Sequence, residues 1–202
     1  MDETSLIQSA KKGDVAAFNR LVLEYQERAY NLALRMMHDD PSAQDAVQES
    51  FISAWEKLNT FRGGSFQVWV LRIVANNCYD ELRRRKRRPQ ADLNPVDAES
   101  GEEMEDPEWM EDASEPPEEH VIRRELEEAI QGCIDRLPDE FKAVVILVDV
   151  QGMDYQSASE VARTPLGTVR SRLARARQRV QDCLQGFREL LPAEFRFSSE
   201  SR

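Results

Sequence analysis

The feature that most constrains the fold is a strongly acidic stretch in the middle of the chain. Residues 89–120 contain 13 acidic residues and several prolines but no lysine or arginine. Such a segment cannot bury enough apolar surface to offset the entropy lost on ordering. We therefore predict an acidic flexible linker over residues 89–117, extended by charge repulsion, between domains at 1–88 and 118–190. Residues 191–202 are predicted to form a C-terminal tail.

The same stretch explains the net charge of −11. Of the 38 acidic residues in the chain, 13 lie in this stretch, so the rest of the chain has 25 acidic and 27 basic residues. The basic residues gather in two blocks, six consecutive bases at 83–88 and six arginines with no acid at 163–179. This asymmetry is typical of DNA-binding proteins, although each block taken alone could be a solvated helix face.

Helical periodicity dominates on both sides of the linker, and no segment alternates as a strand would. In the first domain we predict a long helix with Asp14 as its N-cap, a second helix after residues 40–42, and a third from Phe66 to about Arg85. In the second domain, apolar residues recur at helical spacing from Ile122 onward. The predicted fold is therefore all-α, with two small helical domains.

The last two predicted helices have the proportions of a helix-turn-helix, whose second helix enters the major groove. That second helix, starting near Thr164, keeps apolar residues on one face and carries arginines on the others. Arginine can bind guanine in bidentate fashion or hold phosphates. An arginine-rich helix on the surface of an ordinary bundle is the alternative.

Aromatic residues cluster around the glycine-containing loop at 61–65, beside the first basic block. They are Phe61, Phe66, Trp69 and Tyr79. Aromatic rings beside cations are typical of sites for single-stranded DNA, because bases stack on the rings while the cations hold the phosphates. Most of these rings are expected to be core residues, while Trp69 suits either role.

Other function classes find little support in the sequence. A phosphate-binding loop and paired carboxylates beside a histidine are absent, so we predict no enzymatic activity and no cofactor. Cys78, Cys133 and Cys183 lie far apart, and we expect buried thiols rather than a disulfide frame or a zinc site. No metal site, secretory signal or membrane-spanning run is evident, so we expect a cytoplasmic protein.

Three segments are specific enough to indicate a family. They are DAVQESFISAW (45–55), LNTFRGGSFQVWVLRIVANNCYDELRRRKR (58–87) and TPLGTVRSRLARARQRV (164–180). In this order and spacing they resemble sigma factors of the extracytoplasmic-function group. The resemblance covers about 150 of the 202 residues. It implies a subunit that binds core RNA polymerase, recognises and opens promoters of stress-type genes, and is held in check by an anti-sigma factor.

The resemblance also implies roles for individual residues. Those matching the contact with the clamp helices of the β′ subunit are Asp45, Gln48, Glu49 and Phe51. Those matching the minus-10 contacts, including capture of a flipped base, are Phe61, Arg62, Trp69, Asn76, Arg83 and Arg84. Those matching the minus-35 contacts are Thr168, Arg170, Ser171, Ala174 and Arg175. A contact of the second domain with the β flap and a monomeric free state are further implications.

The sequence departs from the family pattern at three places. The loop between Phe61 and Trp69 is one residue shorter than the common form. Arg163 stands where the helix-turn-helix usually has glycine, and Ala158 and Ala162 replace larger aliphatic residues. A non-glycine residue at positive φ is strained, and small core residues bury less surface, so we expect a looser turn.

A free-standing helix-turn-helix regulator is the alternative function, and it would bind duplex DNA alone, usually as a dimer. For the linker, the family resemblance implies a negatively charged thread through the polymerase channel that later holds RNA. A competing hypothesis is that the linker shields the basic faces of the free protein, because its negative charge lies between them.

Overall fold

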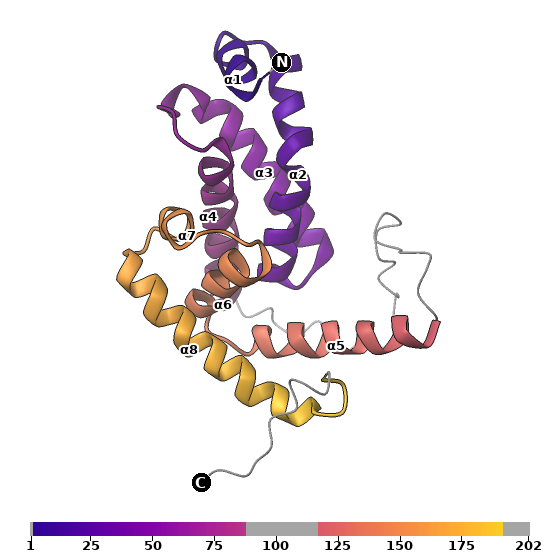
Figure 1. Cartoon of the computed structure of the whole chain (residues 1–202). Helices are drawn as coiled ribbons and strands as arrows, with labels where there is room; N and C mark the ends of the chain where they lie inside the picture. Colours follow the sequence, from indigo (N-terminus) through magenta and orange to yellow (C-terminus); the bar gives the residue numbers. More distant parts are fainter. Residues whose placement is uncertain (1, 88–116, 192–202) are drawn as a thin grey trace.

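The computed structural model describes residues 2–87 and 117–191, and all regular elements in these ranges are helical (Figure 1). The N-terminal domain contains α1 (Glu3–Lys11), α2 (Val15–Met37), α3 (Asp40–Lys57), the 3-10 turn η1 (Leu58–Thr60) and α4 (Phe66–Arg87). The C-terminal domain contains α5 (Pro117–Asp135), α6 (Asp139–Val145), the π-helical η3 (Ile146–Val150), α7 (Tyr155–Val161), α8 (Leu166–Leu184) and the 3-10 turn η4 (Gln185–Phe187). The all-α prediction is confirmed. Most of the acidic linker and nearly all of the tail lie outside the described residues.

In the N-terminal domain, α2, α3 and α4 pack against one another lengthwise (Figure 1). The Asp14 carboxylate caps α2 as predicted, accepting a hydrogen bond from the Ala17 amide at 3.1 Å. Fully buried alanines, among them Ala29, Ala43 and Ala54, let the helix backbones approach closely. The core is thus narrow and leaves the outer faces of α3 and α4 for other contacts.

Four aromatic rings fill the end of this bundle near the 61–65 loop. Phe66 is almost fully buried, with ring centroids 5.5 Å from those of Phe61 and Trp69 and 5.6 Å from that of Tyr25. Helix α1 was not predicted from the sequence, and its last residue, Lys11, donates a hydrogen bond of 2.5 Å to the Phe61 carbonyl. The cluster and this contact together fix where the loop leaves η1.

Removal of the central ring tests this account of the cluster. Phe66→Ala should lower the free energy of unfolding of the N-terminal domain by about 3–5 kcal/mol, because a cavity replaces a fully buried ring. Urea titration followed by circular dichroism measures the change. Leu23→Ala is the control, since Leu23 is 67% exposed and its truncation should cost less than about 0.5 kcal/mol. Equal losses for both variants would contradict the account.

The C-terminal domain contains the predicted helix-turn-helix, made by α7, a tight turn and α8. The Asp154 carboxylate caps α7 by accepting hydrogen bonds from the amides of Gln156 and Ser157. The turn passes through Arg163 at φ +48°, the left-handed conformation that favours glycine. The positive φ expected at Arg163 is therefore confirmed, while the looser turn stays a prediction.

Relief of that strain should stabilise the domain. Arg163→Gly should raise the free energy of unfolding of the C-terminal domain by about 0.5–1 kcal/mol. A non-glycine residue in the left-handed conformation costs about 1–2 kcal/mol. Part of this gain is lost because glycine has more conformational freedom in the unfolded chain. Differential scanning calorimetry measures the change. Arg163→Ala removes the same charge but keeps the Cβ atom, so it should give no such gain. A gain from alanine equal to that from glycine would refute strain as the cause.

The two domains also contact each other, although a flexible linker between separate domains was predicted. Helix α7 packs against α4, and apolar residues of both domains belong to one buried cluster (Figure 1). The Gln151 side chain donates a 2.9 Å hydrogen bond to the Arg28 carbonyl, and His38 lies 3.0 Å from the Asp135 carboxylate. Burial at this boundary raises the pKa of Tyr79 to about 12. The described residues therefore form one continuous body.

The prediction of three buried free thiols is wrong for two of the cysteines. Cys133 and Cys183 form a disulfide, with a Cα–Cα distance of 5.8 Å, and only Cys78 is free. The two partners are 50 residues apart in sequence, but α5 and α8 pack side by side and bring them together. Spacing along the chain does not reveal a pairing that depends on helix packing.

Among the described helices, none has both the length and the apolar character that crossing a membrane would require.

Candidate nucleic-acid interface and apolar grooves

Helix α8 presents two opposite faces. Val169, Leu173 and Ala176 are buried against α6 and α7. The opposite face exposes four of the five predicted minus-35 residues, namely Arg170, Ser171, Ala174 and Arg175, and Thr168 is half-buried at its edge. Because residues three and four apart share a helix face, these side chains form one continuous strip along the first half of α8.

The arginines of α8 divide into two groups. Arg172 hydrogen-bonds to Glu140 and, at 3.3 Å, to Thr164, while the guanidinium of Arg179 lies 5.0 Å from the centre of the Phe141 ring. Arg177 makes bidentate hydrogen bonds of 3.0 and 2.5 Å to Asp149, which raise its pKa above the usual range. These three side chains attach α8 to α6 and η3.

Arg170 and Arg175 make up the second group. Both are exposed, and neither forms a hydrogen bond or an ion pair with any residue in 2–87 or 117–191. Their guanidinium groups therefore keep all of their donors available for an external acceptor. An arginine with unused donors on an outward helix face is suited to guanine or phosphate.

The predicted minus-10 residues differ widely in exposure. Arg62 is exposed, and so are Arg83 and Arg84, which form ion pairs with Asp80 at 3.7 Å and Glu81 at 2.6 Å. Both arginines are exposed, although Glu81 is half-buried, and pairs of this kind between neighbouring turns are weak and can be exchanged for phosphate contacts. Asn76 is half-buried on α4, and its side chain makes no hydrogen bond within the described part of the chain.

Phe61 and Trp69 occupy a different environment. They are only 6% and 8% exposed, and both rings pack against Phe66. In this conformation neither ring is available for stacking on a base. Their burial therefore supports the interpretation of both rings as core residues. At the surface, the loop exposes Arg62 and the residues up to Ser65.

The predicted polymerase-binding residues lie on the outer side of α3. Asp45, Gln48 and Glu49 are exposed and line a shallow hollow of about 380 Å³, bordered by Glu81 and Arg84 of α4. Phe51 is 8% exposed and faces the other side of the helix. Gln48 borders both surfaces.

Phe51 belongs to an apolar groove that sequence reasoning missed. This α2–α3 groove has a volume of about 960 Å³, and its apolar lining residues are Val15, Phe18, Val22, Val47, Phe51, Ile52 and Trp55. Val15 is 57% and Ile52 55% exposed. Large aliphatic residues on the polar side of an amphipathic helix are the only sequence signal that could have indicated it.

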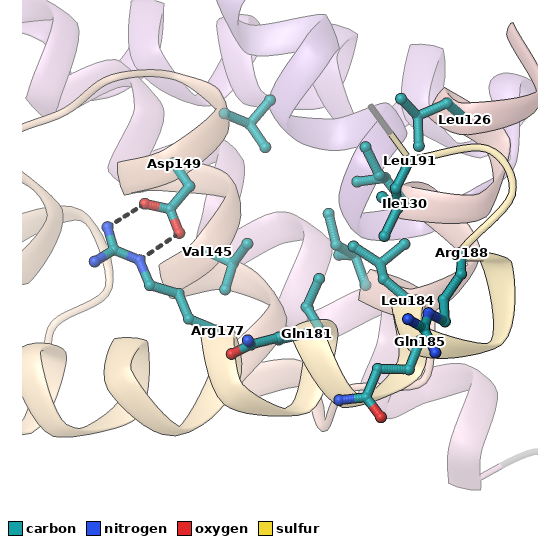
Figure 2. Close-up of a pocket in the computed structure, with 13 residues that line it drawn as sticks. Leu126, Ile130, Val145, Asp149, Arg177, Gln181, Leu184, Gln185, Arg188 and Leu191 are labelled. Atoms are coloured by element: carbon teal, nitrogen blue, oxygen red, sulfur yellow. Dashed lines mark hydrogen bonds and ion pairs between the residues drawn. The ribbon is translucent and has the colours of Figure 1, made fainter. Parts of the chain in front are cut away.

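A second groove lies in the C-terminal domain, and it too was not predicted. This α5–α8 groove has a volume of about 730 Å³ and is lined by side chains of α5, α6, η3 and α8 (Figure 2). Leu126 and Ile130 of α5 face Leu184 of α8 across it, while the Asp149–Arg177 pair closes one end. Its lining is mainly aliphatic, which suits an apolar partner segment.

Both domains match known protein families. Residues 21–88 match the model of Sigma-70 region 2, and residues 127–180 match that of Sigma-70 region 4. The N-terminal bundle is therefore a region 2 domain, and the helix-turn-helix belongs to a region 4 domain. Together they define a two-region sigma factor without enzymatic activity.

Individual relatives narrow the class to a family. The chain is 37% identical to the RNA polymerase sigma-H factor of Pseudomonas aeruginosa over 184 residues, which cover 91% of this chain and 94% of that protein. It is 34% identical to the ECF RNA polymerase sigma-E factor of Escherichia coli, with 89% and 93% covered. The chain belongs to the extracytoplasmic-function (ECF) sigma factors, and it directs RNA polymerase to promoters.

Two solved structures share the fold. One is the sigma factor RpoE in complex with the anti-sigma factor NepR from Bartonella quintana, with a TM-score of 0.60, 21% identity, and 83% of this chain and 96% of that chain covered. The other is CnrH in complex with the cytosolic domain of CnrY, with a TM-score of 0.63, 22% identity, and 90% and 96% covered. Both similarities support the two-domain helical architecture.

The division of the α8 arginines gives a direct prediction. Arg170→Ala or Arg175→Ala should weaken binding of the polymerase holoenzyme to promoter duplex about 10- to 100-fold, because each removes a potential bidentate contact worth about 1–3 kcal/mol. Fluorescence anisotropy with labelled promoter DNA measures the loss. Gln178→Ala is the matched control, since it changes an exposed side chain further along α8. Unchanged affinity in both arginine variants would exclude the strip as the DNA-reading face.

Proposed function

We propose that the two domains divide promoter recognition, with α8 reading the minus-35 duplex and α4 with the 61–65 loop holding the minus-10 element. The observation that carries this proposal is the strip on α8 with Arg170 and Arg175 unpaired among the described residues. Thr168, Ser171 and Ala174 complete the strip. The methyl group of Ala174 can contact only apolar base edges, such as a thymine methyl.

In region 2, exposed cationic side chains are likewise suited to bind the minus-10 element. Arg62, Arg83 and Arg84 hold the strand phosphates, and Asn76 contacts a base edge. A flipped base would enter beside the 61–65 loop, next to the buried rings of Phe61 and Trp69. Binding of separated bases offsets the unstacking cost of a few kcal/mol per step, so binding energy drives promoter opening.

Core polymerase would contact the chain at two places. Asp45, Gln48 and Glu49, exposed on α3, suit the clamp helices of the β′ subunit, with Phe51 supporting α3 from below. The α5–α8 groove suits an apolar segment such as the β flap. Its aliphatic lining supports this assignment, because a helix can lay an apolar face into such a groove.

A third surface, the α2–α3 groove, suits a regulatory partner. RpoE and CnrH were solved in complexes with NepR and with the cytosolic domain of CnrY. We propose that this chain is likewise restrained by an anti-sigma factor, which would cover the α2–α3 groove, and is a monomer when free of partners. Its place of action would be the cytoplasm, at promoters of stress-type genes.

Reconstitution with core RNA polymerase of the source bacterium tests the proposal. The chain and core enzyme are incubated with sheared genomic DNA, and transcript 5′ ends are sequenced. We expect transcripts from a limited set of promoters that share minus-10 and minus-35 elements. If core polymerase stays inactive while the chain alone footprints duplex DNA, the free-standing regulator explains the fold better.

A double variant tests the polymerase surface separately. Asp45→Ala with Glu49→Ala should weaken binding to core polymerase about tenfold, because two charged contacts with the clamp helices are lost. Surface plasmon resonance with immobilised core enzyme measures the affinity. Glu56→Ala provides the control, since Glu56 is exposed on the same helix outside the hollow. Equal affinities for all three proteins would remove α3 from the interface.

A further inference from the structure

We propose that Cys133 and Cys183 form a reversible redox site, whose oxidation by a hydroperoxide locks α5 onto α8 and fixes the α5–α8 groove. The effect on polymerase binding rests on the proposed function of that groove. The cross-link itself does not, because it depends only on the chemistry and position of the two cysteines.

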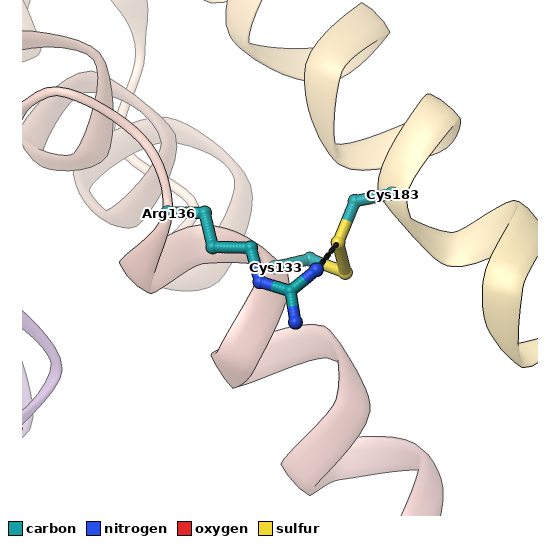
Figure 3. The surroundings of a disulfide bond; sticks show 3 residues. All are labelled: Cys133, Arg136 and Cys183. Atoms are coloured by element: carbon teal, nitrogen blue, oxygen red, sulfur yellow. Dashed lines mark hydrogen bonds between the residues drawn. A yellow bond between two sulfur atoms is a disulfide. The ribbon is translucent and has the colours of Figure 1, made fainter.

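Packing places the two cysteines for pairing. Cys133 lies in the second half of α5 and Cys183 near the end of α8, with a Cα–Cα distance of 5.8 Å (Figure 3). This distance lies within the range of natural disulfides. The pair belongs to the region 4 domain alone, and the cross-link is therefore compatible with any arrangement of the two domains.

The two sulfur atoms have different environments, which suits a two-step reaction. Cys133 is 2% exposed, whereas Cys183 is half-buried and reachable from solvent. A guanidinium nitrogen of Arg136 lies 3.6 Å from the Cys183 sulfur (Figure 3). A cation beside a sulfur favours the nucleophilic thiolate form of a reduced cysteine. Cys183 is thus the residue that an oxidant meets first.

Cys78 shows the opposite environment and serves as an internal reference. It is fully buried in the region 2 core, and burial raises the pKa of its thiol to about 12. Cys78 therefore stays protonated and inaccessible at neutral pH. Its low reactivity makes oxidation selective for the region 4 pair.

The reaction balances with one hydroperoxide per pair. The Cys183 thiolate attacks a peroxide oxygen, the O–O bond breaks, and Cys183 becomes a sulfenic acid while the peroxide leaves as water or an alcohol. The Cys133 thiol then attacks the Cys183 sulfur, the S–S bond forms, and the hydroxyl leaves as water. Two thiols are oxidised and one peroxide is reduced. A dithiol reductant reverses the step.

The bond joins two walls of the groove. Ile130 and Ile134 flank Cys133 on α5, while Val180 and Leu184 flank Cys183 on α8, and these four residues line the groove. Among the α5 residues whose burial is described, the buried ones, Ala129, Cys133 and Ile134, lie in the second half of the helix, and Val121 near its start is 55% exposed. The cross-link limits how far the two walls can separate there. Oxidation therefore preorganises the groove for its partner.

Oxidation of the full chain by one equivalent of hydrogen peroxide tests the redox site. We compare wild type, Cys78→Ser and Cys183→Ser by alkylation and peptide mass spectrometry. Wild type and Cys78→Ser should both give a 133–183 cross-linked peptide, which dithiothreitol removes, and a region 4 unfolding midpoint about 10 °C above that of the reduced protein. Cys183→Ser should give neither. Over-oxidised or intermolecular products in place of this peptide would overturn the proposal, as would an unchanged midpoint.

The effect on the groove is measured with core polymerase. In the Cys78→Ser protein, the oxidised form should bind core enzyme several-fold more tightly than the reduced form, and Cys183→Ser should not respond to peroxide. Equal affinities of the two forms would overturn preorganisation of the groove. A protein that cross-links as expected but drives no transcription in either form would instead contradict the proposed function.

Discussion

The burial of one face of α8 is the constraint on which the C-terminal domain depends. Val169, Leu173 and Ala176 hold the helix against its neighbours, and this burial determines which side faces outward. Polar contacts then set its rotation, because Arg172 and Arg177 are tied to carboxylates on α6 and η3. A helix held by both apolar and bidentate contacts presents its remaining arginines in a defined geometry. Recognition of a duplex requires such preorganisation, since each disordered side chain would lose rotamer entropy on binding.

In the N-terminal domain the corresponding constraint is close packing through small residues. Alanines with no exposed surface bring α2, α3 and α4 together, so the large rings collect at the end of the bundle. The loop that follows η1 is therefore supported by a rigid base although its own glycines are exposed. An exposed loop on a packed base suits a site that must accept a base taken from a duplex.

Sequence periodicity predicted the parts of this structure that depend on local contacts. The helices from Val15 to Arg87 and the cap at Asp14 were accessible, because each reflects neighbours a few residues apart. The positive φ at Arg163 was expected only from comparison with the family pattern. The polar strip on α8 was also accessible, since it lies opposite an apolar stripe. The resemblance to known sigma factors supplied the roles of these residues, which periodicity alone does not contain.

Features that depend on distant contacts were missed. The pairing of Cys133 with Cys183 requires knowledge of how α5 crosses α8, and both grooves arise only where helices from different parts of the chain meet. Helix α1 is short, so its stability comes from contacts such as that of Lys11 with Phe61 rather than from its own pattern. The burial of Phe61 and Trp69 likewise follows from packing, because an aromatic side chain is compatible both with a core and with a DNA-binding surface.

The contact between α4 and α7 holds the two domains close together and so limits the distance that the packed molecule can span. A compact body of this many residues is about 40 Å across, whereas two promoter elements centred about 25 base pairs apart are separated by about 85 Å along B-form DNA. If the two domains read the two elements as proposed above, the packed form would not span both, and the Gln151–Arg28 hydrogen bond and the His38–Asp135 contact would have to break first. Promoter engagement under that proposal would therefore have to supply the free energy that the contact between the two domains contributes.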